Sequence, residues 1–322
     1  MSMYAVSDAR SAVEVEAHSL APAPAKLPFD PLLIDLKKSA DARRLFELEQ
    51  LEVSWDDTTG ALWTFMRPRG RPSYNLDFLE DFHAWQRGII AAFEYRPNDL
   101  RYLLLGSRTP GVFNLGGDLD FFATKIRARD RQALVAYGES CVRILHRNIN
   151  CLGLPMVTIG LAQGDALGGG FESLLSFNVI IAERGVKFGF PENIFGLFPG
   201  MGAYSLVARR VGAAFAEEMM LSGRIYTAEE MKDAGLVHIL AEPGQGIAEA
   251  RDFIQRGRRR HTGNRSVYQI GREVNPVALE ELDRIVQVWA DACLQLRDRD
   301  VKVMQRLVAA QDRLQSTPHA AE

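Results

Sequence analysis

Cysteine is scarce in this chain, and the cysteines present form no motif. Three of them, Cys141, Cys151 and Cys293, are spread over 322 residues without a CxxC pair. An odd number at such wide spacing excludes a disulfide framework and the usual cysteine-based zinc sites. None of the six histidines has the spacing of a paired metal ligand. We therefore expect no metal site, and we expect three buried thiols in a reducing cytoplasm.

A long apolar run and an excess of basic charge are missing as well. The longest stretch without a charged residue is 148–164, which holds 17 residues and includes Pro155 and several polar side chains. A membrane-spanning helix needs about 20 mainly apolar residues. Basic residues number 38 against 41 acidic ones, a net charge of −3, so the chain has no general attraction for phosphate backbones. We expect neither membrane insertion nor a nucleic-acid partner.

The pattern along the chain indicates an α/β protein with extra segments at both ends. Ala, Ser, Pro and Glu dominate the first 26 residues, and we predict that residues 1–47 are a largely disordered extension. Beyond Leu48, apolar periodicity predicts alternating strands and helices, whereas everything after Met201 has a helical pattern. The predicted strands are 51–55, 61–66, 102–105, 156–162, 179–182 and 187–189, and the predicted helices are 76–95, 130–148, 171–176, 276–296 and 301–314.

Two glycine-rich segments each follow a predicted strand. Gly116 and Gly117 come after the strand at 102–105, and Gly168–Gly170 come after the strand at 156–162, where a helix begins. Glycine lets the backbone approach a ligand closely, and two such turns facing each other can hold one oxygen that becomes anionic. From the residues alone, such segments are more often simply tight turns. Neither has the GxGxxG or P-loop form, so we expect no nucleotide cofactor.

Two carboxylates accompany the second glycine segment. Glu172 lies in the first turn of the short helix, and Glu192 follows Pro191, 20 residues later. A helix, a strand and a turn fit between them, which returns the chain to the same end of the sheet. Glu192 lies in the very apolar segment 189–198, where burial raises the pKa of a carboxyl toward the range that proton transfer needs. Each acid alone also has a plainer explanation. Glu172 could simply complement the dipole of its helix, and Glu192 could be a solvated surface charge.

Four segments together resemble the crotonase (enoyl-CoA hydratase/isomerase) superfamily. They are Phe113–Asp118, Gly164–Glu172, Phe190–Glu192 and Phe198–Gly202, and they follow one another in that family's order and spacing over roughly 48–240. The longer segments 112–119, 166–172, 197–205 and 286–296 resemble one branch, the diffusible signal factor (DSF) synthases, bacterial enzymes that make cis-2-unsaturated fatty acid signals. The chain departs from ordinary hydratases at 202–205 and at Asn114 and Leu115.

The resemblance implies a crotonase-like spiral of ββα units over 48–240, with a helical C-terminal region at 241–322 that covers the substrate and forms oligomers, commonly trimers. Gly117 and Gly169 would supply the N–H groups of an oxyanion hole, and Glu172 and Glu192 would be catalytic. The implied reaction is dehydration of a 3-hydroxyacyl chain on acyl carrier protein, followed by hydrolysis of the thioester to the free acid. In that reaction we expect Glu192 to take the α-proton and Glu172 to protonate the departing hydroxyl.

An acyl chain also needs an apolar pocket. Our candidates for its lining are Phe190, Phe195, Leu197, Met201 and Trp289, although such residues are more often simply core. A basic run, Arg256 and Arg258–Arg260, is either a landing site for an acidic carrier protein or a CoA phosphate, or a solvated helix face.

Two other functions stay open at this point. A generic enoyl-CoA hydratase or isomerase would use the same scaffold with a CoA substrate. The DSF synthase branch is also associated with a sensor histidine kinase, and a protein whose role is to bind such a kinase would need no catalysis. The presence of both glutamates and of the glycine turns favours an enzyme.

Overall fold

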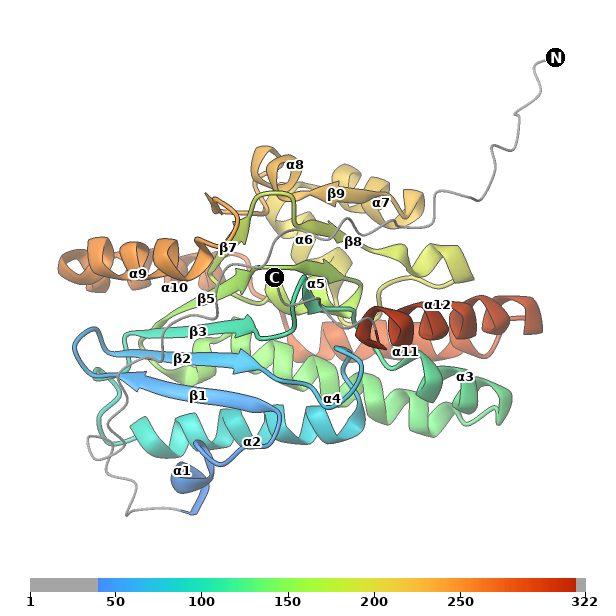
Figure 1. Cartoon of the computed structure of the whole chain (residues 1–322), viewed down its shortest axis with the longest axis horizontal. Helices are drawn as coiled ribbons and strands as arrows, with labels where there is room; N and C mark the ends of the chain where they lie inside the picture. Colours follow the sequence, from blue (N-terminus) through green and yellow to red (C-terminus); the bar gives the residue numbers. More distant parts are fainter. Residues whose placement is uncertain (1–39, 317–322) are drawn as a thin grey trace.

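The computed structural model describes residues 40–316, which form two β-sheets surrounded by helices (Figure 1). Most of the predicted N-terminal extension, residues 1–39, lies outside the described residues. Residues 40–44 of that extension form a short helix, α1 (Ala40–Arg44), which contacts α2 (Leu76–Phe93).

The larger sheet has six strands in the order β1-β2-β3-β5-β7-β10. Its strands are β1 (Leu51–Asp56), β2 (Ala61–Met66), β3 (Tyr102–Ser107), β5 (Val157–Ala162), β7 (Val179–Glu183) and β10 (Ile239–Ala241). The predicted hairpin is confirmed, since β1 and β2 pair antiparallel, while the other neighbours pair parallel. All residues of β2, β5 and β7 are buried, as expected where a parallel sheet is covered on both faces.

The smaller sheet has four short strands in the order β4-β6-β8-β9. They are β4 (Val112–Asn114), β6 (Asp165–Leu167), β8 (Lys187–Gly189) and β9 (Ile225–Thr227). Because β4, β6 and β8 directly follow β3, β5 and β7 in the chain, each turn of the fold adds one strand to each sheet. Helices then lead to the next turn. The predicted α/β fold of ββα units with a helical C-terminal region is confirmed.

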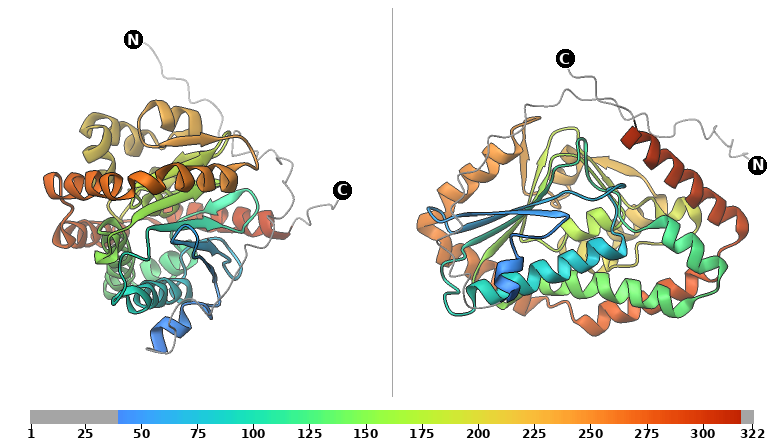
Figure 2. Two further views of the ribbon diagram at one scale, coloured as in Figure 1. Left: turned by 90° about the vertical axis from the view of Figure 1, so that its left-hand side faces the viewer. Right: turned by 60° about the horizontal axis from the view of Figure 1, so that its bottom comes forward.

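Helices cover both faces of the larger sheet. On one face lie α2 and α4 (Arg131–Ile149), side by side in Figure 1, with α3 (Leu119–Arg127) beyond them. Asn75 caps α2 by accepting the N–H of Phe78 at 2.8 Å, as its sequence position predicts. On the opposite face α9 (Gly246–Gly257) and α10 (His261–Val274) pack against β5 and β7, as the turned views of Figure 2 also show.

The C-terminal half is mainly helical, with α5 (Gly169–Leu174), α6 (Ala203–Val211), α7 (Ala213–Ser222), α8 (Ala228–Asp233), α11 (Leu279–Cys293) and α12 (Asp298–Ser316). The prediction that everything after Met201 is helical was wrong at β9 and β10. Each of these strands has three residues at the edge of a sheet, too few to display the alternation by which a strand is recognised. In the described part of the chain, no helix is long and apolar enough to cross a membrane.

Candidate active site

The two glycine turns lie against each other. β4 pairs parallel with β6, so the turns that follow these strands leave the same edge of the smaller sheet. Gly116 has a φ of +91°, and a Cβ atom there would lie 2.7 Å from the backbone nitrogen of Gly169. Only glycine permits both this conformation and this approach. The structure therefore brings together the two segments that the sequence singled out separately.

Within the described residues, the N–H groups of Gly117 and Gly169 have no hydrogen-bond acceptor. Their neighbours are engaged: the Gly116 N–H donates to Asn114 Oδ1 at 2.7 Å, and the Gly168 N–H donates to the Gly189 carbonyl at 2.9 Å. The Asp118 N–H donates to the Tyr137 hydroxyl at 3.3 Å. Two donors on adjacent turns are thus left available for an oxygen atom of a ligand.

Glu172 projects from α5, the helix that begins at Gly169. Its side chain is 1% exposed, and its Oε1 accepts the N–H groups of Met201 at 2.8 Å and Ala203 at 2.9 Å. Burial raises the pKa of Glu172 to about 7, although the two hydrogen bonds favour the charged form and oppose the shift. A carboxyl with this pKa exchanges protons readily near neutral pH.

Glu192 lies in η3 (Pro191–Phe195), a short 3₁₀-helix that begins with Pro191. Its Oε1 touches the Gly168 backbone so closely that a side chain at position 168 would collide with it. Among the described residues, its buried Oε2 has no hydrogen-bond partner. Burial, and then the charge of Glu172, raise the pKa of Glu192 to about 8. The two acids therefore influence each other's protonation near neutral pH.

An apolar cavity lies next to these groups, between α2, α4 and α5. Its volume is about 30 Å³, which is room for about two water molecules. Its lining is contributed by α2, α4, β3 and the end of α5, together with Tyr74 and Met201: Tyr74, Leu79, Phe82, Trp85, Gln86, Leu105, Cys141, Ile144, Leu145, Asn148, Ser173, Ser176, Phe177 and Met201.

Of the five residues predicted to line an acyl pocket, Met201 alone is among those lining this cavity. Phe190 stacks on Phe171 with ring centroids 5.2 Å apart, Phe195 and Leu197 are buried in the core, and Trp289 packs edge-on against Phe122 at 5.0 Å. Sequence reasoning missed the contributions of α2 and α4. The sequence shows the apolar stripe of α2, but it does not show that α4 packs opposite this stripe across the cavity.

The basic run at Arg256–Arg260 lies far from the two glutamates. Gly257 packs against the hydroxyl of Tyr102, the first residue of β3. The glycine turns follow the opposite, carboxyl ends of the strands, where ligands of parallel sheets usually bind. This run therefore does not flank the site.

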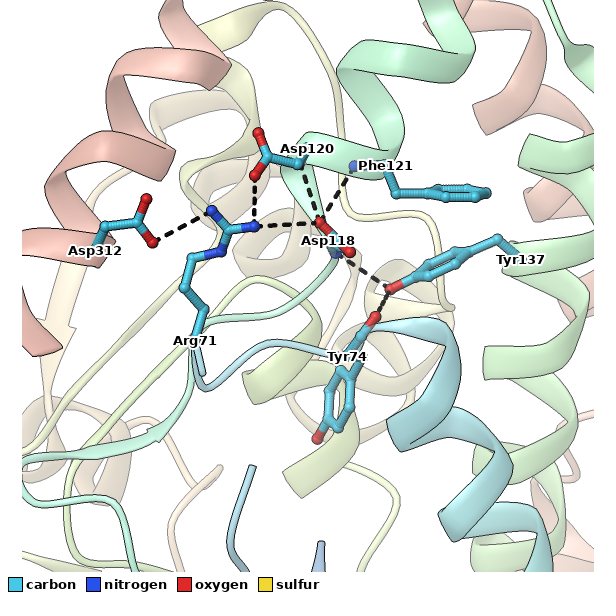
Figure 3. Close-up of polar contacts among 7 residues, drawn as sticks. All are labelled: Arg71, Tyr74, Asp118, Asp120, Phe121, Tyr137 and Asp312. Carbon is cyan, nitrogen blue, oxygen red and sulfur yellow. Dashed lines mark hydrogen bonds and ion pairs between the residues drawn. The ribbon is translucent and has the colours of Figure 1, made fainter. Parts of the chain in front are cut away.

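A cluster of charges ties the C-terminal helix to the Gly117 turn, as Figure 3 shows. Arg71 contacts Asp120 at 2.5 Å, Asp312 of α12 at 3.3 Å and Asp118 at 3.8 Å. Asp118 is also the N-cap of α3, since its Oδ1 accepts the N–H groups of Asp120 and Phe121. Through these contacts α12 is held against α3, and α12 also packs on η3, which carries Glu192.

The described residues contain no group of three or more His, Cys, Asp or Glu side chains arranged to hold a metal ion. Proton transfer by the two carboxyls, beside two free N–H donors, is the chemistry that the site's own groups can perform.

We predict that Glu192→Gln stabilises the protein at high pH. The pKa of Glu192 is about 8 in the folded state against 4.5 ordinarily, so the folded state binds more protons than the unfolded state between these values. Stability is therefore lost as the pH rises through this window. The substitution removes that loss, and we expect the unfolding temperature to rise by roughly 2 °C or more at pH 9, and by less than half as much at pH 5. Equal shifts at both pH values, measured by calorimetry, would contradict a buried carboxyl with a raised pKa.

Comparison with known proteins agrees with this geometry. The family model described as enoyl-CoA hydratase/isomerase matches residues 83–259, more than half of the chain. Rat mitochondrial methylglutaconyl-CoA hydratase is 32% identical over 166 residues, covering 49% of this chain and 50% of the relative. A probable mitochondrial enoyl-CoA hydratase 2 of Arabidopsis thaliana is 28% identical over 258 residues, covering 80% of this chain and 77% of the relative. The chain thus spans about half the length of the mammalian methylglutaconyl-CoA hydratases that it matches.

Solved structures show the same fold. Human mitochondrial delta3-delta2-enoyl-CoA isomerase superposes with a TM-score of 0.66 at 18% identity, covering 83% of this chain and all of that one. Pseudomonas aeruginosa DspI superposes with a TM-score of 0.59 at 21% identity, covering 82% and 96%. Because the family model covers more than half of its length and the solved structures of that family share its fold, this chain belongs to the enoyl-CoA hydratase/isomerase family.

Proposed function

We propose that this chain adds or removes water across the 2,3-bond of a medium-chain acyl thioester. The observation that carries the proposal is the pair of free N–H donors at Gly117 and Gly169 beside the carboxyl groups of Glu172 and Glu192, both with a pKa raised by burial. A thioester carbonyl oxygen bound by both donors becomes an enolate oxygen when the α-proton leaves. By analogy with other oxyanion holes, each donor stabilises that charge by roughly 3–4 kcal/mol.

We assign the α-carbon to Glu192 and the 3-oxygen to Glu172. In dehydration Glu192 takes the α-proton while Glu172 protonates the departing hydroxyl, and in hydration the same proton movements run backward. Burial raises the pKa of both carboxyls toward neutral pH, so either acid can hold or release the proton there. The pair is therefore able to work in both directions.

We place the acyl chain along the cavity between α2, α4 and α5, which would have to widen to admit it. Ser173 and Met201 line its part nearest to the glycine turns, and Asn148 lies at the far end, where it donates to Ser176 at 2.7 Å. The apolar surface of the cavity favours an acyl chain over a polar group.

The finer proposal is a DSF synthase, which dehydrates a 3-hydroxyacyl-acyl carrier protein and then releases the cis-2-unsaturated free acid. It is supported by the sequence resemblance at 112–119, 166–172 and 197–205. Hydrolysis would use the same two N–H donors and a water activated by a glutamate. A generic hydratase acting on CoA thioesters is the second candidate, and the CoA in the names of the matching hydratases favours it. Binding of a sensor histidine kinase would be an additional role of the same chain.

We extend the proposal to assembly through the C-terminal region. Val267, Ile270 and Val274 of α10 are 60–78% exposed and follow one another at helical spacing. An apolar stripe of this kind is typical of a surface that another copy of the chain covers. The region 241–322 would then combine an oligomer contact at α10 with a cover over the site at α12.

The products distinguish the two carriers and the two reactions. We expect purified protein to convert 3-hydroxydodecanoyl-acyl carrier protein to free cis-2-dodecenoic acid, identified by mass spectrometry. Glu172→Gln and Glu192→Gln should each lower the rate by roughly 10²–10⁴-fold, because each removes one proton carrier. Enoyl thioester without free acid would limit the activity to dehydration. Turnover of crotonyl-CoA alone would support the generic hydratase, and full activity in either variant would refute the assigned roles.

We also expect a bell-shaped pH profile. The active form carries one proton on the pair, so kcat/KM should be highest between about pH 7 and pH 8 and fall on both sides. Stopped-flow or steady-state rates across pH 5–10 on one substrate check this expectation. A rate that is flat from pH 5 to pH 8 would show that the pair does not titrate in the free enzyme as described.

Substitutions at Leu145 test the acyl cavity. Leu145 lies on α4, is 5% exposed and lines the cavity. Leu145→Phe should lower kcat/KM for a 12-carbon relative to a 4-carbon thioester by roughly tenfold, whereas Leu145→Ala should preserve or raise that ratio. Leu134→Ala is a matched control, because Leu134 is equally buried on α4 but does not line the cavity. A ratio unchanged in Leu145→Phe would place the acyl chain elsewhere.

A further inference from the structure

Tyr74 contacts both halves of the candidate oxyanion hole. It lies between β2 and α2, and its backbone forms a parallel bridge with Gly117. Its N–H donates to the Gly116 carbonyl at 2.8 Å, and its own carbonyl accepts the hydroxyl of Tyr137 at 2.5 Å (Figure 3). The backbone of Tyr74 therefore borders the Gly116–Asp118 segment as an added strand would.

The side chain of Tyr74 reaches the second half. Its hydroxyl donates to Ser173 Oγ at 2.7 Å, and Ser173 Oγ donates in turn to the Gly170 carbonyl at 2.8 Å. Ser173 lies on α5, the helix that begins at Gly169 and carries Glu172. Tyr74 and Ser173 are both buried, 4% and 7% exposed, so water does not compete for this hydrogen bond.

We propose that Tyr74 is a positioning residue that holds the N–H donors of Gly117 and Gly169 at the spacing needed to bind one oxygen atom. This inference rests on the proposed function. One donor belongs to a loop and the other to a helix of six residues, so neither is held by a long regular element. Oxyanion donors act only when both lie about 2.7–3.1 Å from the developing charge. A single residue that bonds to both segments restricts their relative movement.

Tyr137 supports the same turn from the other side. Its hydroxyl lies between the Asp118 N–H and the Tyr74 carbonyl, and its ring stacks on Phe121 with centroids 5.3 Å apart. Because Gly116 N–H, Gly116 C=O and Asp118 N–H are all engaged, the peptide plane that presents the Gly117 N–H has little freedom to rotate. Tyr74 is distinguished from Tyr137 by its additional bond to α5.

Packing is the competing explanation for Tyr74, since its ring contacts Phe78 and Phe82 at centroid distances of 5.9 Å and 5.7 Å. Tyr74→Phe keeps the ring and removes only the hydroxyl. We expect kcat to fall about tenfold while KM changes less than about twofold, because the loss falls on the transition state. The pH profile should keep its shape, since both glutamates remain.

The partner side chain completes a double-mutant cycle. Ser173→Ala should lower kcat to a similar extent, and Tyr74→Phe/Ser173→Ala should be no slower than the slower single variant, because one shared bond is broken in all three. Tyr226→Phe is the control: its phenol is also buried, 3% exposed, but within the described residues its hydroxyl has no hydrogen-bond partner. That variant should keep its kcat.

A readout without turnover separates this inference from the proposed function. A saturated acyl-CoA thioester carrying a ¹³C carbonyl is bound, and its C=O stretch is measured by isotope-edited infrared spectroscopy. Two hydrogen bonds should lower the frequency in the wild type, and Tyr74→Phe should show a clearly smaller shift. No shift in the wild type would refute the oxyanion hole itself. A full shift in the wild type, together with an equal shift and an unchanged kcat in Tyr74→Phe, would refute the positioning role alone.

Discussion

The parallel pairing of β4 with β6 is the contact on which the rest of the site depends. This pairing sets Val112 opposite Asp165 and Asn114 opposite Ala166, so the turns that follow the two strands leave the same edge of the sheet. At that edge the two turns approach more closely than residues with side chains permit: a Cβ at Gly170 would collide with the Asn114 carbonyl. The glycines are therefore required by contact between the turns as well as by access for a ligand.

The glutamate pair adds an electrostatic constraint to this geometry. Glu172 is held by two backbone N–H groups, whereas Glu192 has a buried oxygen without a partner in the described part of the chain. A buried carboxyl in such a state destabilises the fold when it is charged. Protonation of either acid lowers that cost near neutral pH. Beyond the C-terminal end of α5, the half-buried Arg210 donates to the carbonyls of Leu175 and Phe177 at 2.7 Å and 2.8 Å, which helps to keep this short helix in place.

Local sequence predicted the parts of the site that lie within one turn of the fold. The glycine turns, both glutamates and most strands were placed from short motifs and periodicity, because each depends on neighbouring residues. The wall of the cavity was not predictable in this way, since Trp85 of α2 and Leu145 of α4 meet only after both helices pack on the sheet. The edge strands β9 and β10 were missed because three residues have no measurable period. Trp289, which we predicted to line an acyl pocket, packs against Phe122 and Gly200.

The Arg71 cluster is a second place where residues far apart in the sequence meet next to the candidate site. Arg71 and Asp312 are 241 residues apart, yet they meet beside Asp118, the residue that follows Gly117. With 21% of its side chain exposed, Arg71 is partly shielded from solvent, so salt screens its ion pairs less than it screens those of a fully exposed arginine. Because α12 packs against both α3 and the segment carrying Glu192, movement of α12 away from the body would disturb the donor turn and the acid together. The position of α12 and the alignment of the Gly117 turn with Glu192 are therefore coupled through these contacts.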